Sequence, residues 1–417
     1  MKPESKTFCM HPFTGLATRE DGAIKACCRS LPVGWIQENS LEEIWNNEVM
    51  QDLRRKVLTG ERPEVCKPCF ELEDQGVESL RQRHINGVIP EARINLYPNT
   101  QFKEIMPFEF PTMEIKLNNL CNLKCRMCHP MDSTSWNDWK EVEEFYRKEG
   151  NFLPDKIIKL NLERKPFLDS FDDTDNWWAS FEKLLPHFRR VEFAGGEPLM
   201  DPQHYRILDM LKPYAKNIEI KYATNGTTLG IKGGRTVHDY WPYFRSVAVN
   251  VSLDGIHDVY NYIRGNSDFN EVEKNIKEIQ TIPNVSRVVG AFTAQAGNIL
   301  QAAECVDYFI NKLNIVFYSH RVSYPNCLSA QVLPKELKLL AIDRLKEVSS
   351  RVSSFDNVKK YPVLEKITQG QIKDNINYLE AKDQHHLWAD FVKFNQRLDA
   401  TRNQSLTSVI PEFKPYV

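Results

Sequence analysis

One group of cysteines constrains this chain more than any other feature. Cys121, Cys125 and Cys128 stand in a C-x3-C-x2-C spacing after an apolar run at 113–117, which predicts a buried strand leading into a loop. A loop can fold three thiolates around one face of a metal centre, and thiolates favour zinc or iron–sulfur clusters. Structural zinc and ordinary electron-transfer clusters take four protein ligands, so three thiolates leave one position open to a small molecule. The alternative is a buried or zinc-binding cysteine group, although its nearest further ligand, His129, directly adjoins Cys128.

A second group of cysteines lies in the first block of the chain. Between its two halves, Ser40 begins a capping-box spacing, apolar residues recur at helical intervals and Gly60 ends the pattern, so we expect a helix there. Four thiols brought together by this helix can hold either tetrahedral zinc or a fully ligated 4Fe–4S cluster. Neighbouring side chains of an extended backbone point to opposite faces, which argues against Cys28 as a ligand beside Cys27. The candidate ligands are Cys9, Cys27, Cys66 and Cys69.

After a proline-interrupted linker at 86–111, apolar β-rich runs alternate with helical segments. This alternation predicts a parallel βα arrangement with its sites at the carboxyl ends of the strands. The region after Leu333 is predicted to be mostly helical, with Asp399 and Arg402 forming a salt bridge on a helix surface. The expected strands are 113–117, 191–194, 218–223, 247–253, 287–293 and 315–324, and expected helices include 205–211, 271–279 and 299–313.

Polar residues directly follow three of these expected strands. Gly195-Gly196-Glu197-Pro198 follows the second strand, where glycines allow close backbone approach to a ligand and a carboxylate can bind an ammonium group. Asn225 follows the third strand, and Ser252 and Asp254 follow the fourth, where a hydroxyl and a carboxylate suit a ribose or an amino-acid group. Each motif alone is equally consistent with a turn or a helix cap. Their repetition at successive strand ends favours a binding site.

These motifs together resemble the radical S-adenosylmethionine (radical SAM) superfamily. The resemblance rests on the three-cysteine motif, on Gly195–Pro198 and on Ser252-Leu253-Asp254-Gly255. The pattern Cys9-x12-Gly22-x4-Cys27, followed by Cys66-x2-Cys69, is similar to a twitch domain, the shortened relative of the SPASM auxiliary-cluster domain. The family implies an α/β fold with a partial (β/α)6 TIM-like barrel. The expected divisions are an N-terminal cluster-binding module at 1–85, the linker at 86–111, the barrel at 112–326 and a mostly helical C-terminal region at 327–417.

The resemblance also implies the cofactors. Cys121, Cys125 and Cys128 would hold a 4Fe–4S cluster whose open iron is chelated by the methionine end of S-adenosylmethionine, and a second, auxiliary 4Fe–4S cluster would occupy the first block, with Cys27 favoured over Cys28. Reductive cleavage of S-adenosylmethionine then gives a 5′-deoxyadenosyl radical that abstracts hydrogen from the substrate. The implied cofactor-binding residues are Gly195, Gly196, Glu197, Pro198, Asn225, Ser252, Asp254 and Arg264.

The implied activity is oxidation or cross-linking of a peptide, sugar or related small metabolite, supported by a reductase or a flavodoxin- or ferredoxin-type electron donor. The alternatives are a non-enzymatic iron–sulfur electron-transfer or scaffold protein, and a zinc-stabilised binding module. A net charge of −2 gives no general drive toward nucleic acid or an anionic membrane, and no apolar run approaches the length of a membrane span. The beginning of the chain lacks the apolar core of a signal peptide, so we expect a cytoplasmic protein.

Several features depart from the family pattern. The auxiliary module precedes the barrel, Met127 occupies a usually aromatic position, and the C-terminal half of the SPASM cysteine set is missing, so we expect one auxiliary cluster. The long excursion at 130–190, with its tryptophans and the acidic group at 169–175, is expected to be a solvated loop, with a substrate-gating lid as the alternative. Cys327 follows the last expected strand and is predicted to be an inert buried thiol; a hydrogen-atom donor and a cluster ligand are the alternatives.

Overall fold

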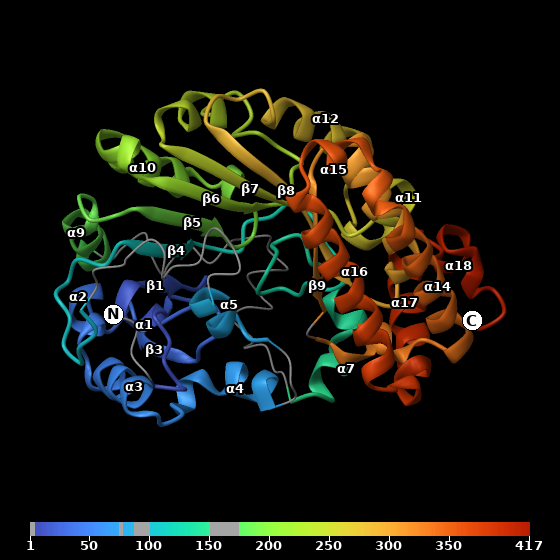
Figure 1. The fold of residues 1–417 in the computed structure, drawn as a ribbon, viewed down its shortest axis with the longest axis horizontal. Helices are drawn as coiled ribbons and strands as arrows, with labels where there is room; N and C mark the ends of the chain where they lie inside the picture. The colour runs from blue at the N-terminus through green and yellow to red at the C-terminus, as the bar shows by residue number, and fades with distance from the viewer. Residues whose placement is uncertain (1–4, 75–77, 87–100, 151–174, 323) are drawn as a thin grey trace. The chain divides into compact units, whose positions relative to one another are not determined.

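The computed structural model describes residues 5–74, 78–86, 101–150, 175–322 and 324–417 (Figure 1). The chain divides into two compact units, each of which is described by itself. The first unit comprises Met1–Asn118, Phe167–Lys221 and Tyr243–Ser246, and the second comprises Asn119–Pro166, Tyr222–Pro242 and Val247–Val417. Among the described residues, no helix is long and apolar enough to span a membrane.

The sheet follows the order β3-β2-β1-β4-β5-β6-β7-β8-β9. β4 and β5 pair in parallel, as do β7, β8 and β9, which fits a partial TIM-like barrel. The six expected strands are confirmed as β4 to β9, to within a few residues at their ends. Their bounds are β4 (Thr112–Lys116), β5 (Arg190–Ala194), β6 (Glu219–Thr224), β7 (Ser246–Ser252), β8 (Val285–Ala294) and β9 (Val316–Arg321).

Three further strands in the first unit were not predicted. β1 (Gly15–Thr18) runs parallel to β4 and antiparallel to β2 (Ala23–Lys25), which in turn pairs with β3 (Pro32–Trp35). All four residues of β1 are buried, so the strand lacks the alternation of apolar and polar residues that marks a half-exposed strand. The N-terminal module therefore contributes its own strands to the sheet.

The helix expected after Ser40 is in fact two helices. Ser40 forms the predicted capping box at the start of α2 (Leu41–Trp45). The side chain of Asn47 then accepts a hydrogen bond from the backbone N–H of Met50 at 2.9 Å and begins α3 (Glu48–Thr59). Gly60 ends α3 at a φ of 95°, a conformation that glycine adopts without strain. The prediction of one continuous helix was wrong because asparagine is a strong helix-starting residue.

The described part of the expected linker is fixed to these helices. Trp45 donates from its indole nitrogen to the carbonyl of Pro107 at 2.8 Å, and Asn46 donates to that of Met106 at 2.7 Å. The buried guanidinium of Arg54 donates to the carbonyl of Glu104 at 2.9 Å. The other helices of the first unit are α1 (His11–Thr14), η1 (Glu64–Cys66), α4 (Lys67–Asp74), α5 (Leu80–Asn86), α9 (Asp175–Leu184), η3 (Pro198–Met200), α10 (Pro202–Leu211) and η4 (Lys212–Asn217).

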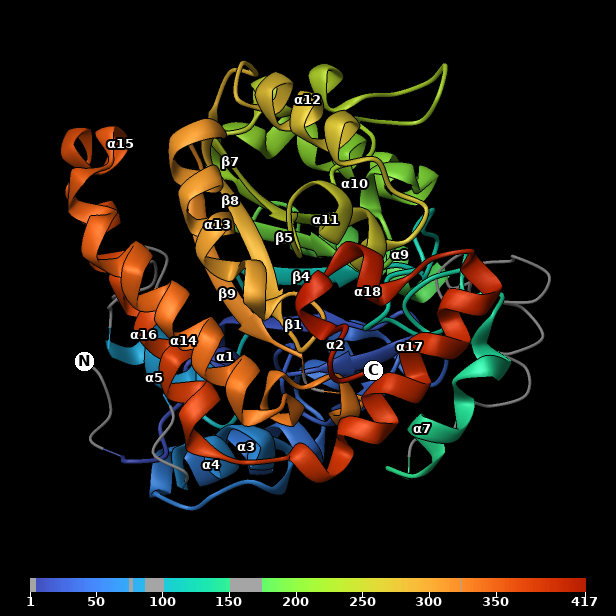
Figure 2. The same ribbon diagram turned by 90° about the vertical axis from the view of Figure 1, so that its right-hand side faces the viewer.

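The second unit packs helices against β7, β8 and β9. The buried residues of β7 are Val247, Ala248, Val249 and Val251. Figure 2 shows α14 (Lys335–Arg351) beside α16 (Val363–Ala381), and α16 also contacts β9. The expected helical C-terminal region is present. The remaining helices are η2 (Trp139–Glu141), α7 (Glu143–Arg147), η5 (Val237–Asp239), η6 (Trp241–Tyr243, which crosses the unit boundary), α11 (His257–Arg264), α12 (Phe269–Ile279), η7 (Ile299–Gln301), α13 (Ala302–Asp307), η8 (Tyr308–Lys312), η9 (Asn326–Leu328), η10 (Ala330–Val332), η11 (Val352–Ser354), α15 (Asp356–Lys360), η12 (His385–Leu387), α17 (Trp388–Arg402), α18 (Leu406–Val409) and η13 (Pro411–Phe413).

Candidate metal centres

The three-cysteine loop follows β4 in the sequence and belongs to the second unit. Cys121 and Cys125 are buried around Leu123, and Cys128 is half-buried beside them. The Cys128 thiol donates a hydrogen bond to the sulfur of Cys125, which lowers the pKa of Cys125 and raises that of Cys128. The loop thus favours a thiolate at Cys125, the form that binds metals.

The backbone of this loop is held by side chains from the segment that follows it. All three cysteine carbonyls accept a hydrogen bond from this segment. The donors are Ser135 Oγ to Cys121 at 2.8 Å, Trp136 Nε1 to Cys125 at 3.0 Å and Tyr146 Oη to Cys128 at 3.1 Å. These bonds fix the positions of the ligand-bearing residues before any metal binds.

Asn225 and Arg264 lie beside these thiols. The Asn225 amide donates to the sulfur of Cys121 at 3.7 Å and to Asn122 Oδ1 at 2.9 Å. Burial alone would lower the pKa of the Arg264 guanidinium, but the nearby Cys125 and Asp254 raise it well above its ordinary value. A permanent positive charge therefore lies close to a thiol that readily loses its proton.

Asp254 is fully buried, and its carboxylate already accepts hydrogen bonds from within the protein. Its carboxylate accepts from Arg264 at 2.7 Å and from the backbone N–H of Thr293 at 2.6 Å. Arg264 Nε has no hydrogen-bond partner among the described residues. The geometry therefore makes Asp254 the residue that orients Arg264. Ser252, at the end of β7, is half-buried.

The Gly195–Pro198 segment ends β5 in the first unit. Gly195 has a φ of 118°, and the backbone N–H of Gly196 donates to the carbonyl of Asn118 at 3.2 Å. Glu197 is only 1% exposed and accepts from the backbone N–H of Leu199 at 3.1 Å, which caps η3. A small pocket at the ends of β4 and β5 is lined in part by Asn118, Gly196, Glu197, Pro198, Asp201 and His204.

The four thiols predicted in the first block come together in the first unit. Burial raises the pKa of Cys9 well above its usual value and that of Cys66 to about 12, and Cys27 raises both further. Burial and Cys27 likewise raise the pKa of Cys69. Cys28, by contrast, is exposed, and its main charged neighbour is the carboxylate of Glu114. Cys28 thus has a different environment from the other four thiols.

Both thiol sets fit an iron–sulfur cluster in donor type and number. A cluster binds each thiolate through a different iron, so its ligands surround a larger body than a single ion. Within the described residues, no group of three or more His, Cys, Asp or Glu side chains is placed so that it could hold a metal ion. Three thiols on one loop and four in the N-terminal module are the observed donor sets.

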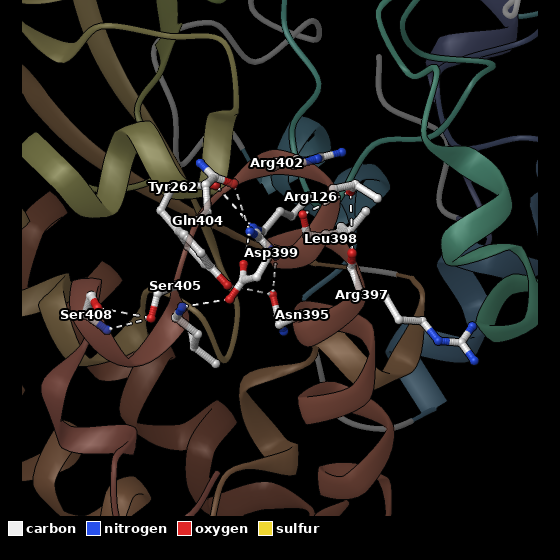
Figure 3. A network of polar contacts seen from close by, with 12 residues as sticks. Arg126, Tyr262, Asn395, Arg397, Leu398, Asp399, Arg402, Gln404, Ser405 and Ser408 are labelled. Atoms are coloured by element: carbon white, nitrogen blue, oxygen red, sulfur yellow. Dashed lines mark hydrogen bonds and ion pairs between the residues drawn. The ribbon is translucent and has the colours of Figure 1, made fainter.

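The C-terminal helix α17 contributes contacts that the sequence analysis missed. The prediction that Asp399 and Arg402 form a surface salt bridge was wrong. Asp399 instead pairs with the buried Arg126 (Figure 3). Arg402 pairs with Asp138 at 2.7 Å. Both side chains are thus directed to the three-cysteine loop or to the segment after it. The spacing of Asn395, Asp399 and Arg402, which places them on one helix face, was the available signal.

The structure also describes several other features that the sequence analysis singled out. Trp136 and Trp139 of the long excursion are buried, so its beginning is packed rather than solvated. The part at 151–174, with most of the acidic group, lies outside the described residues. Cys327 is buried in η9, and burial raises its pKa. Met127 is partly buried against the cysteines.

Two family models match the chain. Residues 115–290 match the radical SAM superfamily, and residues 9–70 match the SPASM iron–sulfur cluster-binding domain. A search of curated proteins finds no match.

Solved structures that the chain matches include anSMEcpe with bound AdoMet and Cp18Cys peptide, at 16% identity and a TM-score of 0.35, covering 58% of this chain and 61% of that one. Another is Streptococcus suis SuiB bound to S-adenosylmethionine, at 14% identity and a TM-score of 0.34, covering 76% of this chain and 68% of that one. The chain therefore spans less than two thirds of the first of these structures.

Proposed function

Because the chain belongs to the radical SAM superfamily and carries a SPASM iron–sulfur cluster-binding domain, we propose that it oxidises or cross-links a peptide, sugar or related small metabolite. The observation that carries the proposal is the three-thiol loop, with its hydrogen-bonded Cys125–Cys128 pair and a neighbouring guanidinium. Three protein thiolates leave a cluster iron open to a small chelating molecule.

Cys121, Cys125 and Cys128 would hold the 4Fe–4S cluster that, with S-adenosylmethionine, supplies a 5′-deoxyadenosyl radical for hydrogen abstraction. The protein's own part is to bind and orient S-adenosylmethionine and the substrate and to keep water away from the radical. Asp254 orients Arg264, whose Nε is available to the methionine carboxylate. Asn225, already hydrogen-bonded to Cys121, and Ser252 bind the ribose or the carboxylate.

Gly196 and Glu197 bind the methionine ammonium group in this proposal. The backbone turn at Gly195 exposes peptide groups, and the nearly buried Glu197 carboxylate supplies the opposite charge. A charge-assisted hydrogen bond is about twice as strong as a neutral one, so this carboxylate would contribute much of the cofactor affinity.

The four thiols Cys9, Cys27, Cys66 and Cys69 would hold an auxiliary 4Fe–4S cluster. Removing one hydrogen atom leaves a substrate radical, and completing an oxidation requires the loss of one more electron. An auxiliary cluster provides an acceptor for that electron, which favours a dehydrogenation or cross-link over a rearrangement. A flavodoxin- or ferredoxin-type donor would supply the initiating electron.

The test is an anaerobic assay of the reconstituted full chain with S-adenosylmethionine and dithionite. Pools of peptides and of sugars are screened separately by mass spectrometry, and a product lighter by two hydrogen atoms is expected together with 5′-deoxyadenosine. Iron-loaded protein that forms no 5′-deoxyadenosine under any condition would instead support an electron-transfer or scaffold role.

A further inference from the structure

Residues of the C-terminal region bind the three-cysteine loop through Arg126. Arg126 lies between Cys125 and Met127, and its side chain is only 1% exposed. Its guanidinium stacks on the ring of Tyr262 at 3.7 Å and donates to Asn395 at 2.9 Å and Gln404 at 2.9 Å. The same guanidinium forms an ion pair with Asp399, as Figure 3 shows. A charge inside the loop is thereby neutralised by α17.

Asp399 is itself held in place on both sides. One carboxylate oxygen accepts from Arg126, and the other accepts from the backbone N–H of Leu406 at 2.8 Å, beside the start of α18. Asn395 is similarly fixed, because its amide donates to the carbonyl of Phe391 at 2.8 Å while its oxygen faces the guanidinium. The acceptors for Arg126 are therefore rigid.

An arginine of α17 contacts the residue on the other side of Cys125. Arg402 donates to the carbonyl of Lys124 at 2.8 Å, and its guanidinium lies 4.7 Å from the ring centre of Trp136. Trp136 in turn donates to the carbonyl of Cys125. α17 therefore contacts both Lys124 and Arg126, the residues before and after Cys125. A shift of α17 would move Cys125, a proposed cluster ligand, through both neighbours.

Packing alone does not account for this arrangement. Apolar side chains of similar volume could fasten a helix to a loop without burying an ion pair, which is costly to desolvate. The ion pair fixes the orientation of the Arg126 side chain. It also neutralises the charge of the guanidinium beside the thiols. The net charge and hydrogen bonds around an iron–sulfur cluster set its reduction potential.

We propose that Arg126 and Asp399 are positioning residues, through which α17 fixes the three-cysteine loop and sets the reduction potential of its cluster. This proposal rests on the proposed function for the part that concerns the cluster. The part that concerns the loop can be measured without any metal.

The test compares Asp399→Asn with Asp390→Asn. Asp390 is on the same helix, but its carboxylate pairs with Lys148 at 2.9 Å, away from Arg126. In the metal-free full chain, Asp399→Asn should raise the alkylation rate of Cys125 and Cys128 about ten-fold, while Asp390→Asn leaves it unchanged. Equal rates in the two variants would overturn the loop part of the proposal, whether or not the chain binds a cluster.

The reduction potential of the reconstituted chain tests the electrostatic part. Asp399→Asn leaves the Arg126 charge unbalanced, which favours the reduced and more negative cluster, so the potential should rise. The double variant Arg126→Gln/Asp399→Asn removes both charges and should return the potential toward that of the unmodified chain. If the pair served only as a structural anchor, Asp399→Asn would leave the potential unchanged, or the double variant would shift it further than Asp399→Asn does.

If Asp399→Asn fails to fold, Gln404→Ala provides the second variant. It removes one neutral acceptor of Arg126 and keeps the ion pair, so alkylation should rise by a smaller factor and the potential should stay the same. An unchanged alkylation rate in folded Gln404→Ala would count against the proposal.

Discussion

The two thiol sets of this protein are built in opposite ways. The three cysteines of the loop lie within eight residues of one another, and neighbouring side chains hold each of their carbonyls. The four thiols of the N-terminal module come from positions between Cys9 and Cys69. In the loop, the pKa of Cys125 is lowered and that of its partner Cys128 is raised, whereas burial raises the pKa of Cys9, Cys66 and Cys69. Hydrogen bonds within the protein fix the backbone of the loop before a metal binds. The module, by contrast, requires a metal to make its buried thiolates stable.

The largest effect expected from this difference is the loss of cofactor cleavage when the loop thiols are removed. Reconstituted protein should hold about eight iron atoms, and Cys121→Ala/Cys125→Ala/Cys128→Ala should hold about four, since each 4Fe–4S cluster carries four irons. Formation of 5′-deoxyadenosine should stop. Iron analysis and chromatography measure both outcomes, with Cys305→Ala, a buried thiol outside both sets, as the control. Continued cleavage in the triple variant would refute the role of the loop.

Removing cysteines from the module should leave cleavage of S-adenosylmethionine intact. Cys66→Ala/Cys69→Ala should also lose about four irons but still form 5′-deoxyadenosine in the absence of substrate, because the loop is untouched. Conversion of a substrate should stop after hydrogen abstraction. The matched control is Cys28→Ala, which removes a neighbouring thiol with a different environment. If the double variant and the control contain equal iron, the module does not use Cys66 and Cys69.

A smaller effect is expected at Glu197. Glu197→Gln keeps an oxygen that can accept from Leu199, so the cap of η3 survives while the negative charge is lost. Weakening the contact with the methionine ammonium should cost about 1–2 kcal/mol, or about ten-fold in affinity for S-adenosylmethionine by calorimetry. Asp268→Asn makes the same exchange at the cap of α12 and should have no effect. Unchanged affinity with full iron content would reduce the Gly195–Pro198 segment to a structural turn.

The smallest expected effect is a difference in pH dependence between the metal-free thiols. A lowered pKa means that Cys125 is a thiolate at lower pH, so its alkylation should begin below the pH at which an ordinary cysteine reacts. The pKa of Cys66, raised to about 12, keeps it protonated through neutral and mildly alkaline pH. Mass spectrometry of alkylated peptides across a pH series measures both thiols in one sample. Simultaneous reaction of the two would contradict the contrast drawn between loop and module.

How far the sequence predicted this structure depended on how far apart the interacting residues lie. β4 to β9 and the three-cysteine loop are continuous segments whose patterns are visible locally. β1 was missed because four buried residues carry no alternation, and its pairing with β4 joins residues that lie far apart in the sequence, such as Gly15 and Thr112. The Arg126–Asp399 pair spans 273 positions, so nothing near either residue reveals the other. The cysteine ligands could be predicted from the local sequence, whereas the distant residues that hold their loop in place could not.

The contact between Arg126 and α17 also has a consequence for the order of assembly during synthesis. A ribosome completes the module cysteines within the first 69 residues, whereas the acceptors of Arg126 emerge only after residue 395. Domains generally fold as they are made, and the compact unit that contains the module is complete at Ser246, so it can take up iron before α17 is made. The loop cysteines, although translated well before α17, would acquire their final geometry only near the end of translation. Iron delivery to the two sites would then be separated in time by the synthesis of the segment between Ser246 and α17.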